Sequence, residues 1–302
     1  SENMLQQYDP RNEHLLIYID GELYPREEAK ISVFDSAVQG GDAVWEGIRV
    51  YDGRIFSLDE HLERLQNSAH AMAFREVPSN EEIKAALFKT LQANGMRDET
   101  HIRLTLTRGK KITSGMDPRL NQFGPTLIIV AEWKPPVYPP EITLVTSSVR
   151  RNSAMSLDSK IHHNNLINNI LAKIEANHAG ADAGLMLDKD GFVSEANGVN
   201  VFCIRKGVVY TPHADSCLPG ITRQHVINLC REQGIPIVEK NLSLTEFYTA
   251  DQVFTTGTMG ELTKVAEIDG RAIRSRMEED LLEQIKGYFR AMTRSGGEPL
   301  PF

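Results

Sequence analysis

Two residues and two loops of this chain carry groups that can do chemistry together. Lys160 offers a primary amine and Glu195 offers a carboxylate. Two later segments are rich in small residues, whose backbone N–H groups can face an anion. The four segments are 157–165 (LDSKIHHNN), 193–197 (VSEAN), 218–223 (LPGITR) and 255–261 (TTGTMGE). An amine, a carboxylate and two loops of N–H donors are what a protein needs to hold pyridoxal phosphate (PLP), which points to transamination.

In their residues and their order along the chain, these segments resemble those of the class IV (fold type IV) PLP-dependent aminotransferases, and most of all the branched-chain-amino-acid aminotransferases. The resemblance runs from about Tyr18 to about Arg271. It implies an α/β (α+β) fold of two domains, like that of D-amino-acid aminotransferase, with the cofactor in the cleft between the domains. Family members are usually homodimers, so the resemblance also implies a dimer.

Composition sets the broad class. The chain has 302 residues, 41% of them apolar and 25% charged, which is typical of a globular protein. The formal charge of −8 gives no reason to expect a nucleic-acid partner. The apolar run 127–131 is far too short to span a membrane, and residues 1–10 lack the apolar core of a secretory signal. Three cysteines without C-x-x-C spacing favour neither disulfides nor zinc, so we expect a cytoplasmic protein.

Prolines mark the domain boundary. Four prolines lie between residues 135 and 140, where they disfavour helix and central strand. We therefore predict an N-terminal small α/β domain over 1–133, a proline-rich linker over 134–140 and a C-terminal PLP-binding domain over 141–302.

In the first half, Asp20-Gly21 and Asp52-Gly53 predict type I′ hairpin turns. Ser57 and Ser79, each with a glutamate three residues later, predict capping boxes that open helices. Further strands are expected over 101–107 and 126–132. They flank a polar loop, 109–125, whose length favours a functional role.

In the second half, strands and helices intersperse. Strands are expected over 142–147, 184–187, 200–204, 208–210, 237–239 and 252–255, and helices over about 164–178, 221–233 and 276–292.

Lys160 is the central candidate. A lysine beside Asp158 and Ser159 is also typical of a solvated surface. Its place between a strand and a helix, with Asn164 four residues later, matches the family pattern. The resemblance implies that Lys160 forms an internal aldimine with PLP, is displaced by the substrate amine, and then moves a proton between Cα and C4′.

The resemblance gives other residues cofactor roles. Glu195 keeps the pyridine nitrogen protonated, although the segment alone favours a turn carboxylate. The phosphate is bound by the amides of Ile221 and Thr222, by Thr258 and by Arg64, for which a helical surface pair with Glu60 is the alternative. The implied cofactor-binding residues are Arg64, Lys160, Asn165, Glu195, Asn197, Gly220, Ile221, Thr222 and Thr258.

Substrate residues are implied in the same way. Trp45 matches an aromatic residue of the side-chain pocket, although a core position is an equal alternative. Arg103 matches an arginine that binds a substrate carboxylate. The expected set is Gly40, Trp45, His101, Arg103, Thr258 and Met259. Tyrosines of the branched-chain enzymes are replaced here by Gly40, His101 and Asn165, so the pocket departs from theirs.

His162 and His163 invite a metal hypothesis, but no third ligand stands at a suitable spacing, so no metal is predicted. The leading hypothesis is a transaminase that moves an amino group from a branched-chain L-amino acid to 2-oxoglutarate or another 2-oxo acid. Alternatives are a D-amino-acid or (R)-amine transaminase and a lyase like aminodeoxychorismate lyase. A non-enzymatic binding protein would require Lys160 to be idle.

Overall fold

The structure is a computed structural model that describes residues 7–135, 139–215 and 217–302. It divides into two compact units, each made from separate stretches of the chain. Unit 1 is formed mainly by 139–160 and 166–292, and unit 2 by 8–135, 161–165 and 293–302. The predicted linker over 134–140 includes residues 136–138, which lie outside the described residues, so its role stays a prediction.

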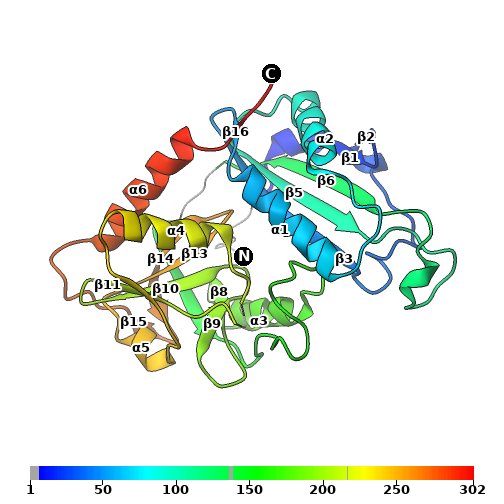
Figure 1. The fold of residues 1–302 in the computed structure, drawn as a ribbon. Coiled ribbons are helices and arrows are strands. Elements are labelled where there is room, and N and C mark those ends of the chain that lie inside the picture. The colour runs from blue at the N-terminus through cyan, green and yellow to red at the C-terminus, as the bar shows by residue number, and fades with distance from the viewer. Residues whose placement is uncertain (1–6, 136–138, 216) are drawn as a thin grey trace. The chain divides into compact units, whose positions relative to one another are not determined.

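Unit 2 is built on an antiparallel sheet with the strand order β16-β4-β3-β5-β6-β1-β2. Its strands are β1 (Leu16–Ile19), β2 (Glu22–Pro25), β3 (Ala43–Tyr51), β4 (Arg54–Ile55), β5 (Thr100–Thr107), β6 (Thr126–Trp133) and β16 (Glu298–Pro299). Helices α1 (Leu58–Ala71) and α2 (Asn80–Ala93) cover one face of this sheet (Figure 1). Short 3-10 helices are η1 (Pro10–His14), η2 (Arg26–Glu28) and η3 (Pro118–Leu120).

Alternation along β3 and β5 gives this sheet two different faces. Ile48 and Ile102 are fully buried in the core with Leu62 and Leu65 of α1. Each such side chain stabilises the fold by about 2 kcal/mol through the apolar area removed from water. Because successive side chains point to opposite faces, the other face carries polar and aromatic groups. They are Trp45, Arg49, His101 and Arg103.

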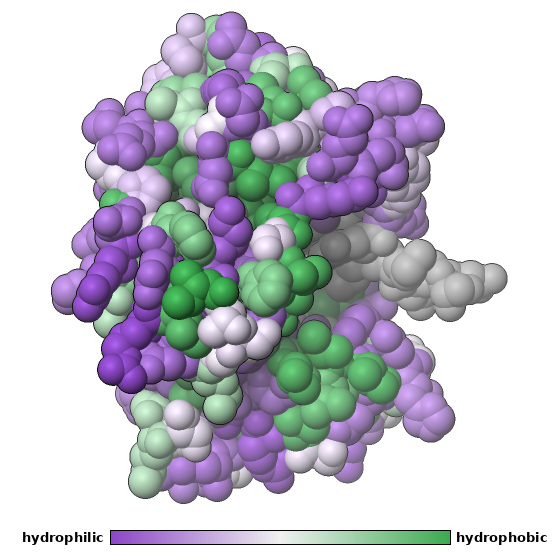
Figure 2. Space-filling view, turned by 90° about the vertical axis from the view of Figure 1, so that its right-hand side faces the viewer, coloured by the Kyte–Doolittle hydropathy of each residue, from purple (hydrophilic) through white to green (hydrophobic). Residues whose placement is uncertain are grey.

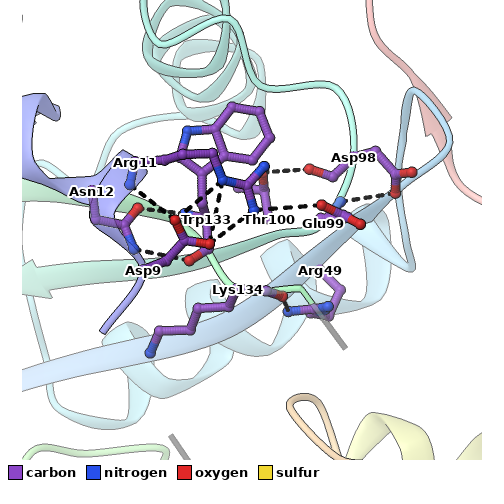
Figure 3. Close-up of polar contacts among 9 residues, drawn as sticks. All are labelled: Asp9, Arg11, Asn12, Arg49, Asp98, Glu99, Thr100, Trp133 and Lys134. Atoms are coloured by element: carbon purple, nitrogen blue, oxygen red, sulfur yellow. Dashed lines mark hydrogen bonds and ion pairs between the residues drawn. The ribbon is translucent and has the colours of Figure 1, made fainter. Parts of the chain in front are cut away.

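Side-chain contacts hold the end of β6 in place (Figure 3). Asn12 donates from Nδ2 to the Trp133 carbonyl at 2.9 Å and accepts from the Trp133 amide at 2.7 Å. The Arg11 guanidinium lies 4.5 Å from the centroid of the Trp133 ring. Arg49 Nη1 donates to the Lys134 carbonyl at 2.8 Å. The chain is thus fixed to the sheet up to the start of the proline-rich segment.

Unit 1 contains a mixed sheet with the order β12-β11-β10-β13-β14-β7-β8-β9, in which β15 pairs with β14. Its strands are β7 (Ile142–Thr146), β8 (Ala183–Leu187), β9 (Val193–Ala196), β10 (Asn200–Arg205), β11 (Val208–Thr211), β12 (Ile237–Glu239), β13 (Gln252–Gly257), β14 (Glu261–Ile268) and β15 (Arg271–Ala272). Its helices are α3 (Ile167–His178), α4 (Ile221–Glu232), α5 (Leu244–Tyr248) and most of α6 (Leu281–Ser295). Pairs β11–β12, β14–β7 and β7–β8 are parallel. Helices and sheets in both units confirm the predicted fold class.

The predicted turns are confirmed. Asp20, Gly21, Asp52 and Gly53 all have positive φ, as a type I′ turn requires. Ser79 caps α2 by accepting a hydrogen bond from the Glu82 amide, which is one half of the predicted capping box.

Three predicted details are wrong. Ser57 lies at the start of α1 in a left-handed conformation, so its side chain does not make the predicted cap. Helix α3 begins at Ile167 rather than 164, because residues 161–165 pair with β3. Helix α6 begins at Leu281 rather than 276, because Asp280 accepts from the Glu283 amide and sets the first turn there. Among the described residues, no helix is long and apolar enough to cross a membrane.

Candidate active site

Lys160 is the last residue of one stretch of unit 1, and the chain passes into unit 2 directly after it. Its side chain is exposed, and its amide donates to Asp158 Oδ1 at 3.0 Å. Lys160 itself belongs to unit 1, whereas the next five residues belong to unit 2. The chain returns to unit 1 at Leu166, just before α3.

The segment 161–165, here called the crossing segment, is bonded to the start of β3. Val44 and His163 form an antiparallel bridge. The supporting hydrogen bonds are Trp45 N to the His162 carbonyl (2.9 Å), Asn164 N to the Ala43 carbonyl (3.0 Å), Trp45 Nε1 to the His163 carbonyl (3.1 Å) and Asn165 Nδ2 to the Gly41 carbonyl (2.9 Å). The backbone that follows Lys160 is therefore held by unit 2. Asn165 itself is exposed.

Glu195 lies in β9, opposite Met186 of β8, and is buried. The sequence suggested either a turn carboxylate or a cofactor ligand, and the strand position rules out the turn. Arg151 Nε lies 2.6 Å from Glu195 Oε1, an ion pair without hydrogen-bond geometry. Burial raises the pKa of Glu195 to about 7, against the opposing effect of the Arg151 charge.

Asn200 connects Glu195 to the start of α4. Its Nδ2 lies 3.4 Å from Glu195 Oε2 and donates to the Leu218 carbonyl at 2.9 Å. Its Oδ1 accepts from the Gly220 amide at 3.2 Å. A Cβ at Gly220 would lie 2.3 Å from that oxygen, so only glycine fits. The carboxylate and the helix start are parts of one network.

The start of α4 is suited to an anion. Gly220 occupies the N-cap position and, having no side chain, offers no capping group to the amides of Ile221 and Thr222. Free N–H groups and the helix dipole attract phosphate at such an end. A helix begins at Ile221 as the sequence predicted, and its binding of a phosphate stays a prediction.

The second loop joins β13 to β14 and carries Thr258 and Met259. A Cβ at Gly257 would lie 2.8 Å from Val199 Cγ1, so the close packing requires glycine. The buried Thr256 hydroxyl has no hydrogen-bond partner among the described residues. A buried hydroxyl without a partner costs about 1–3 kcal/mol, so an anion accepting from it would be stabilising. The residues of this loop fit a bound phosphate.

Asn197 plays a structural part in the same region. Its Oδ1 accepts from the Gly184 amide at 2.8 Å, and its carbonyl accepts from Asn169 Nδ2 at 2.9 Å. Asn169 Oδ1 in turn accepts from Arg151 Nη1 at 3.1 Å. The network around Glu195 therefore includes Arg151 and Asn169, which the sequence did not single out.

Arg64 forms an ion pair in unit 2 that the sequence analysis missed. Its Nη2 lies 2.7 Å from Oε1 of Glu46, a fully buried residue of β3. His61 and His162 also contact this carboxylate. One signal was available: alternation places Glu46 on the apolar face of β3, where a carboxylate needs partners.

The predicted substrate residues of β3 and β5 are neighbours. The Arg103 guanidinium lies 3.5 Å from the centroid of the Trp45 ring. A Cβ at Gly47, opposite Arg103, would lie 3.1 Å from His101 Nε2 and 3.4 Å from the Trp45 ring. Glycine therefore makes room for both side chains.

Burial governs the charges on this face. It lowers the pKa of Arg103 to about 10, which leaves the guanidinium charged at neutral pH. Burial, together with the charges of Lys134 and Arg49, lowers the pKa of His101 to about 3, so this imidazole is neutral. Gly40 lies outside the sheet with φ +103°, a conformation that favours glycine.

No group of three or more His, Cys, Asp or Glu in the part of the chain that the structure describes is placed to hold a metal ion.

Known proteins resemble this chain over most of its length. A family model described as amino-transferase class IV matches residues 43–268. The chain is 57% identical over 294 residues to branched-chain-amino-acid aminotransferase-like protein 2 of Arabidopsis thaliana, a match covering 97% of this chain and 53% of that protein. It is 41% identical to a putative branched-chain-amino-acid aminotransferase of Methanocaldococcus jannaschii, covering 93% and 97%.

The fold has solved counterparts. A branched-chain amino acid aminotransferase from Thermobaculum terrenum, solved in its PLP form, superposes with a TM-score of 0.82 at 27% identity, covering 94% of this chain and 95% of that one. The chain spans about half the length of the Arabidopsis relatives it matches.

Proposed function

This chain belongs to the class IV aminotransferases, and we propose that it is a PLP-dependent transaminase. The proposed reaction moves an amino group from an amino acid, first of all a branched-chain L-amino acid, to 2-oxoglutarate or another 2-oxo acid. The observation that supports it most is the buried Glu195, paired with Arg151 and linked through Asn200 to the helix start at Gly220.

The cofactor chemistry assigns roles to two residues. Bound PLP supplies a ring that accepts the electron pair left when a substrate Cα–H bond breaks. Lys160 Nζ holds the cofactor covalently between turnovers and carries the proton between substrate atoms once it is released. The carboxylate of Glu195 holds a proton on the ring nitrogen, and the adjacent Arg151 guanidinium favours the ionised form that this role needs.

The phosphate is proposed to be bound by neutral and charged donors. The amides of Ile221 and Thr222 and the hydroxyl of Thr258 donate to it, and Arg64 adds a positive charge. Asn165 is proposed to donate from its amide to the phenolic oxygen of the cofactor. Asn197 is proposed to act through the network that holds Glu195.

The substrate is proposed to lie against the polar face of β3 and β5. Arg103 binds a carboxylate with its planar guanidinium, which stacks on the Trp45 ring in a cation–π contact. His101, neutral at the pH of catalysis, is a hydrogen-bonding wall where related enzymes have a tyrosine. Gly40, Thr258 and Met259 complete the proposed pocket.

Exposed apolar side chains on one helix support the proposal of a homodimer. Helix α3 exposes four apolar side chains at helical spacing. Figure 2 shows one face of the protein, on which hydrophobic residues, drawn in green, lie exposed among hydrophilic ones. The four residues are Ile167 (72% exposed), Ile170 (56%), Leu171 (45%) and Ile174 (56%). An apolar stripe of this kind usually marks an interaction surface, and a second copy of the chain is the proposed partner. Free, buried cysteines agree with the proposed cytoplasmic location.

Three measurements test the proposal. Borohydride treatment followed by peptide mapping should label Lys160 and no other lysine. The visible band of the purified protein should be bleached by an L-amino acid and restored by a 2-oxo acid, whereas Lys160→Ala should respond to no donor. Faster bleaching by D-amino acids or (R)-1-phenylethylamine would favour those transaminases instead. Release of pyruvate from aminodeoxychorismate without an acceptor would favour the lyase.

A further inference from the structure

Glu46 has a dense set of donors around its carboxylate. Arg64 donates to it from two nitrogens, Nε to Oε2 at 2.8 Å and Nη2 to Oε1 at 2.7 Å. His61 Nδ1 lies 2.7 Å from Oε1, and His162 Nδ1 lies 3.2 Å from Oε2. Each carboxylate oxygen thus faces at least two donors, and the Glu46 side chain is completely buried.

The contacts define the charge of each group. Burial alone would raise the pKa of Glu46, but the bonds from His162 and His61 and the charge of Arg64 hold it below its usual value. Burial lowers the pKa of His162 to about 4, so this ring is neutral at pH 7. Because an ionised carboxylate only accepts, both imidazoles donate from Nδ1.

Two histidines contact the Glu46 carboxylate in addition to Arg64. His61 lies one turn before Arg64 on α1, and His162 lies in the crossing segment. The amide of His162 is itself bonded to Ser68 Oγ at 3.1 Å, and its ring packs 4.0 Å from that of Trp45. These contacts fix the orientation of the Glu46 carboxylate. Because Arg64 donates two hydrogen bonds to this fixed carboxylate, the plane of its guanidinium is fixed as well.

We propose that Glu46 is a positioning residue, whose two-point ion pair with Arg64 orients the guanidinium for the phosphate of the cofactor. The inference rests on the proposed function, in which Arg64 contributes to phosphate binding. The Arg64 side chain is 15% exposed and that of Glu46 is fully buried, so the ion pair is held by the protein on the Glu46 side. A guanidinium fixed beforehand loses less conformational freedom when an anion binds.

An alternative effect has the opposite sign. If Glu46 only neutralised Arg64, removing its charge would strengthen phosphate binding, because the cation would act alone. If Glu46 positions Arg64, removing the charge weakens phosphate binding, because the guanidinium loses its fixed plane. Glu46→Gln separates these effects, since it keeps the shape and replaces one acceptor oxygen by a donor.

The experiment compares PLP with pyridoxal, which lacks the phosphate. The cofactor is removed from the full chain, and both compounds are titrated into the wild type and into Glu46→Gln, with absorbance as the readout. We expect the ratio of PLP affinity to pyridoxal affinity to fall by about tenfold in Glu46→Gln. In an Arg64→Met background the same substitution should lower the ratio no further.

Two variants keep the result interpretable. Glu46→Asp retains the charge but shortens the reach, so it should give an intermediate ratio even if Glu46→Gln does not fold. Asp35→Asn alters another buried carboxylate of unit 2, which accepts from Thr126 Oγ1 at 2.7 Å, and should leave the ratio unchanged. A folded Glu46→Gln or Glu46→Asp with an unchanged or higher ratio would overturn the inference. A wild type that binds neither compound would instead overturn the proposed function.

Discussion

The guanidinium of Arg103 lies 3.5 Å from the centroid of the Trp45 ring, across two neighbouring strands of one sheet. Neither β3 nor β5 carries a carboxylate beside this arginine on that face; the strand residues there are Trp45, Gly47, Arg49, His101 and Thr105. A cation that is stacked on an indole and partly desolvated is ready to bind an anion.

Replacement of Arg103 should therefore affect a dicarboxylic substrate more than a monocarboxylic one. Arg103→Leu is expected to lower kcat/KM for 2-oxoglutarate by about 100-fold, because one charged, two-point interaction is lost. Arg103→Lys should recover part of this loss, since it keeps the charge without the planar fork. Steady-state kinetics with 2-oxoglutarate and with a monocarboxylic oxo acid provide the comparison, and equal losses for both would contradict the assignment.

A substitution at Gly47 tests the packing around Trp45 and His101. In Gly47→Ala the new Cβ would press on His101 Nε2 and the Trp45 ring, at 3.1 and 3.4 Å. We expect a rise in KM of about tenfold with little change in the unfolding midpoint, because both neighbours face away from the core. Gly95→Ala, where no atom lies within 4 Å but φ is +64°, should show the reverse pattern of lower stability and unchanged KM.

Glu195 should make the stability of the cofactor-free protein depend on pH. Its pKa is raised from 4.5 to about 7 by burial, so between these values the folded state keeps a proton that the unfolded state has released. Stability from this group is fully present below about pH 4.5 and is lost as pH rises towards 7, by about 1.4 kcal/mol per unit at most.

Urea unfolding at pH 5 and pH 7.5 measures this effect. Glu195→Gln, which cannot ionise, should gain stability relative to the wild type as the pH is raised. Parallel pH profiles for the two proteins would show that Glu195 is already ionised at pH 5.

The exposed stripe of α3 should control assembly. Ile170→Glu places a charge in the middle of the stripe and is expected to raise the dimer dissociation constant by more than about tenfold. Gln92→Glu adds the same charge at an exposed polar position of α2, away from the stripe, and should have no effect. Sedimentation equilibrium distinguishes the two, and an unchanged dimer in Ile170→Glu would place the interface elsewhere.

Local patterns were enough to predict many elements of this fold. Asp20-Gly21 requires two residues with positive φ, and the hairpin follows from that requirement alone. Gly220 is likewise predicted at a helix start from the local pattern, and its close approach to Asn200 explains why it must be glycine. In such cases the cause lies within a few residues of its effect.

Other features depend on contacts that no local pattern reveals. Glu46 meets His162 across 116 positions of sequence, and Arg151 meets Glu195 across 44. The start of α3 was misplaced for the same reason, because the residues assigned to its first turn bond to β3 instead. Tertiary pairing overrides helix propensity there.

The crossing segment has a practical consequence for dissecting the protein. Residues 161–165 and 293–302 belong to the same compact unit as 8–135. More than a hundred residues separate 161–165 from 293–302 along the chain. A gene cut at the prolines would deprive the first fragment of its His163 bridge and of the outermost strand β16. Separately expressed halves should consequently fold poorly, and a circular permutant that keeps every stretch would be the better starting point for engineering.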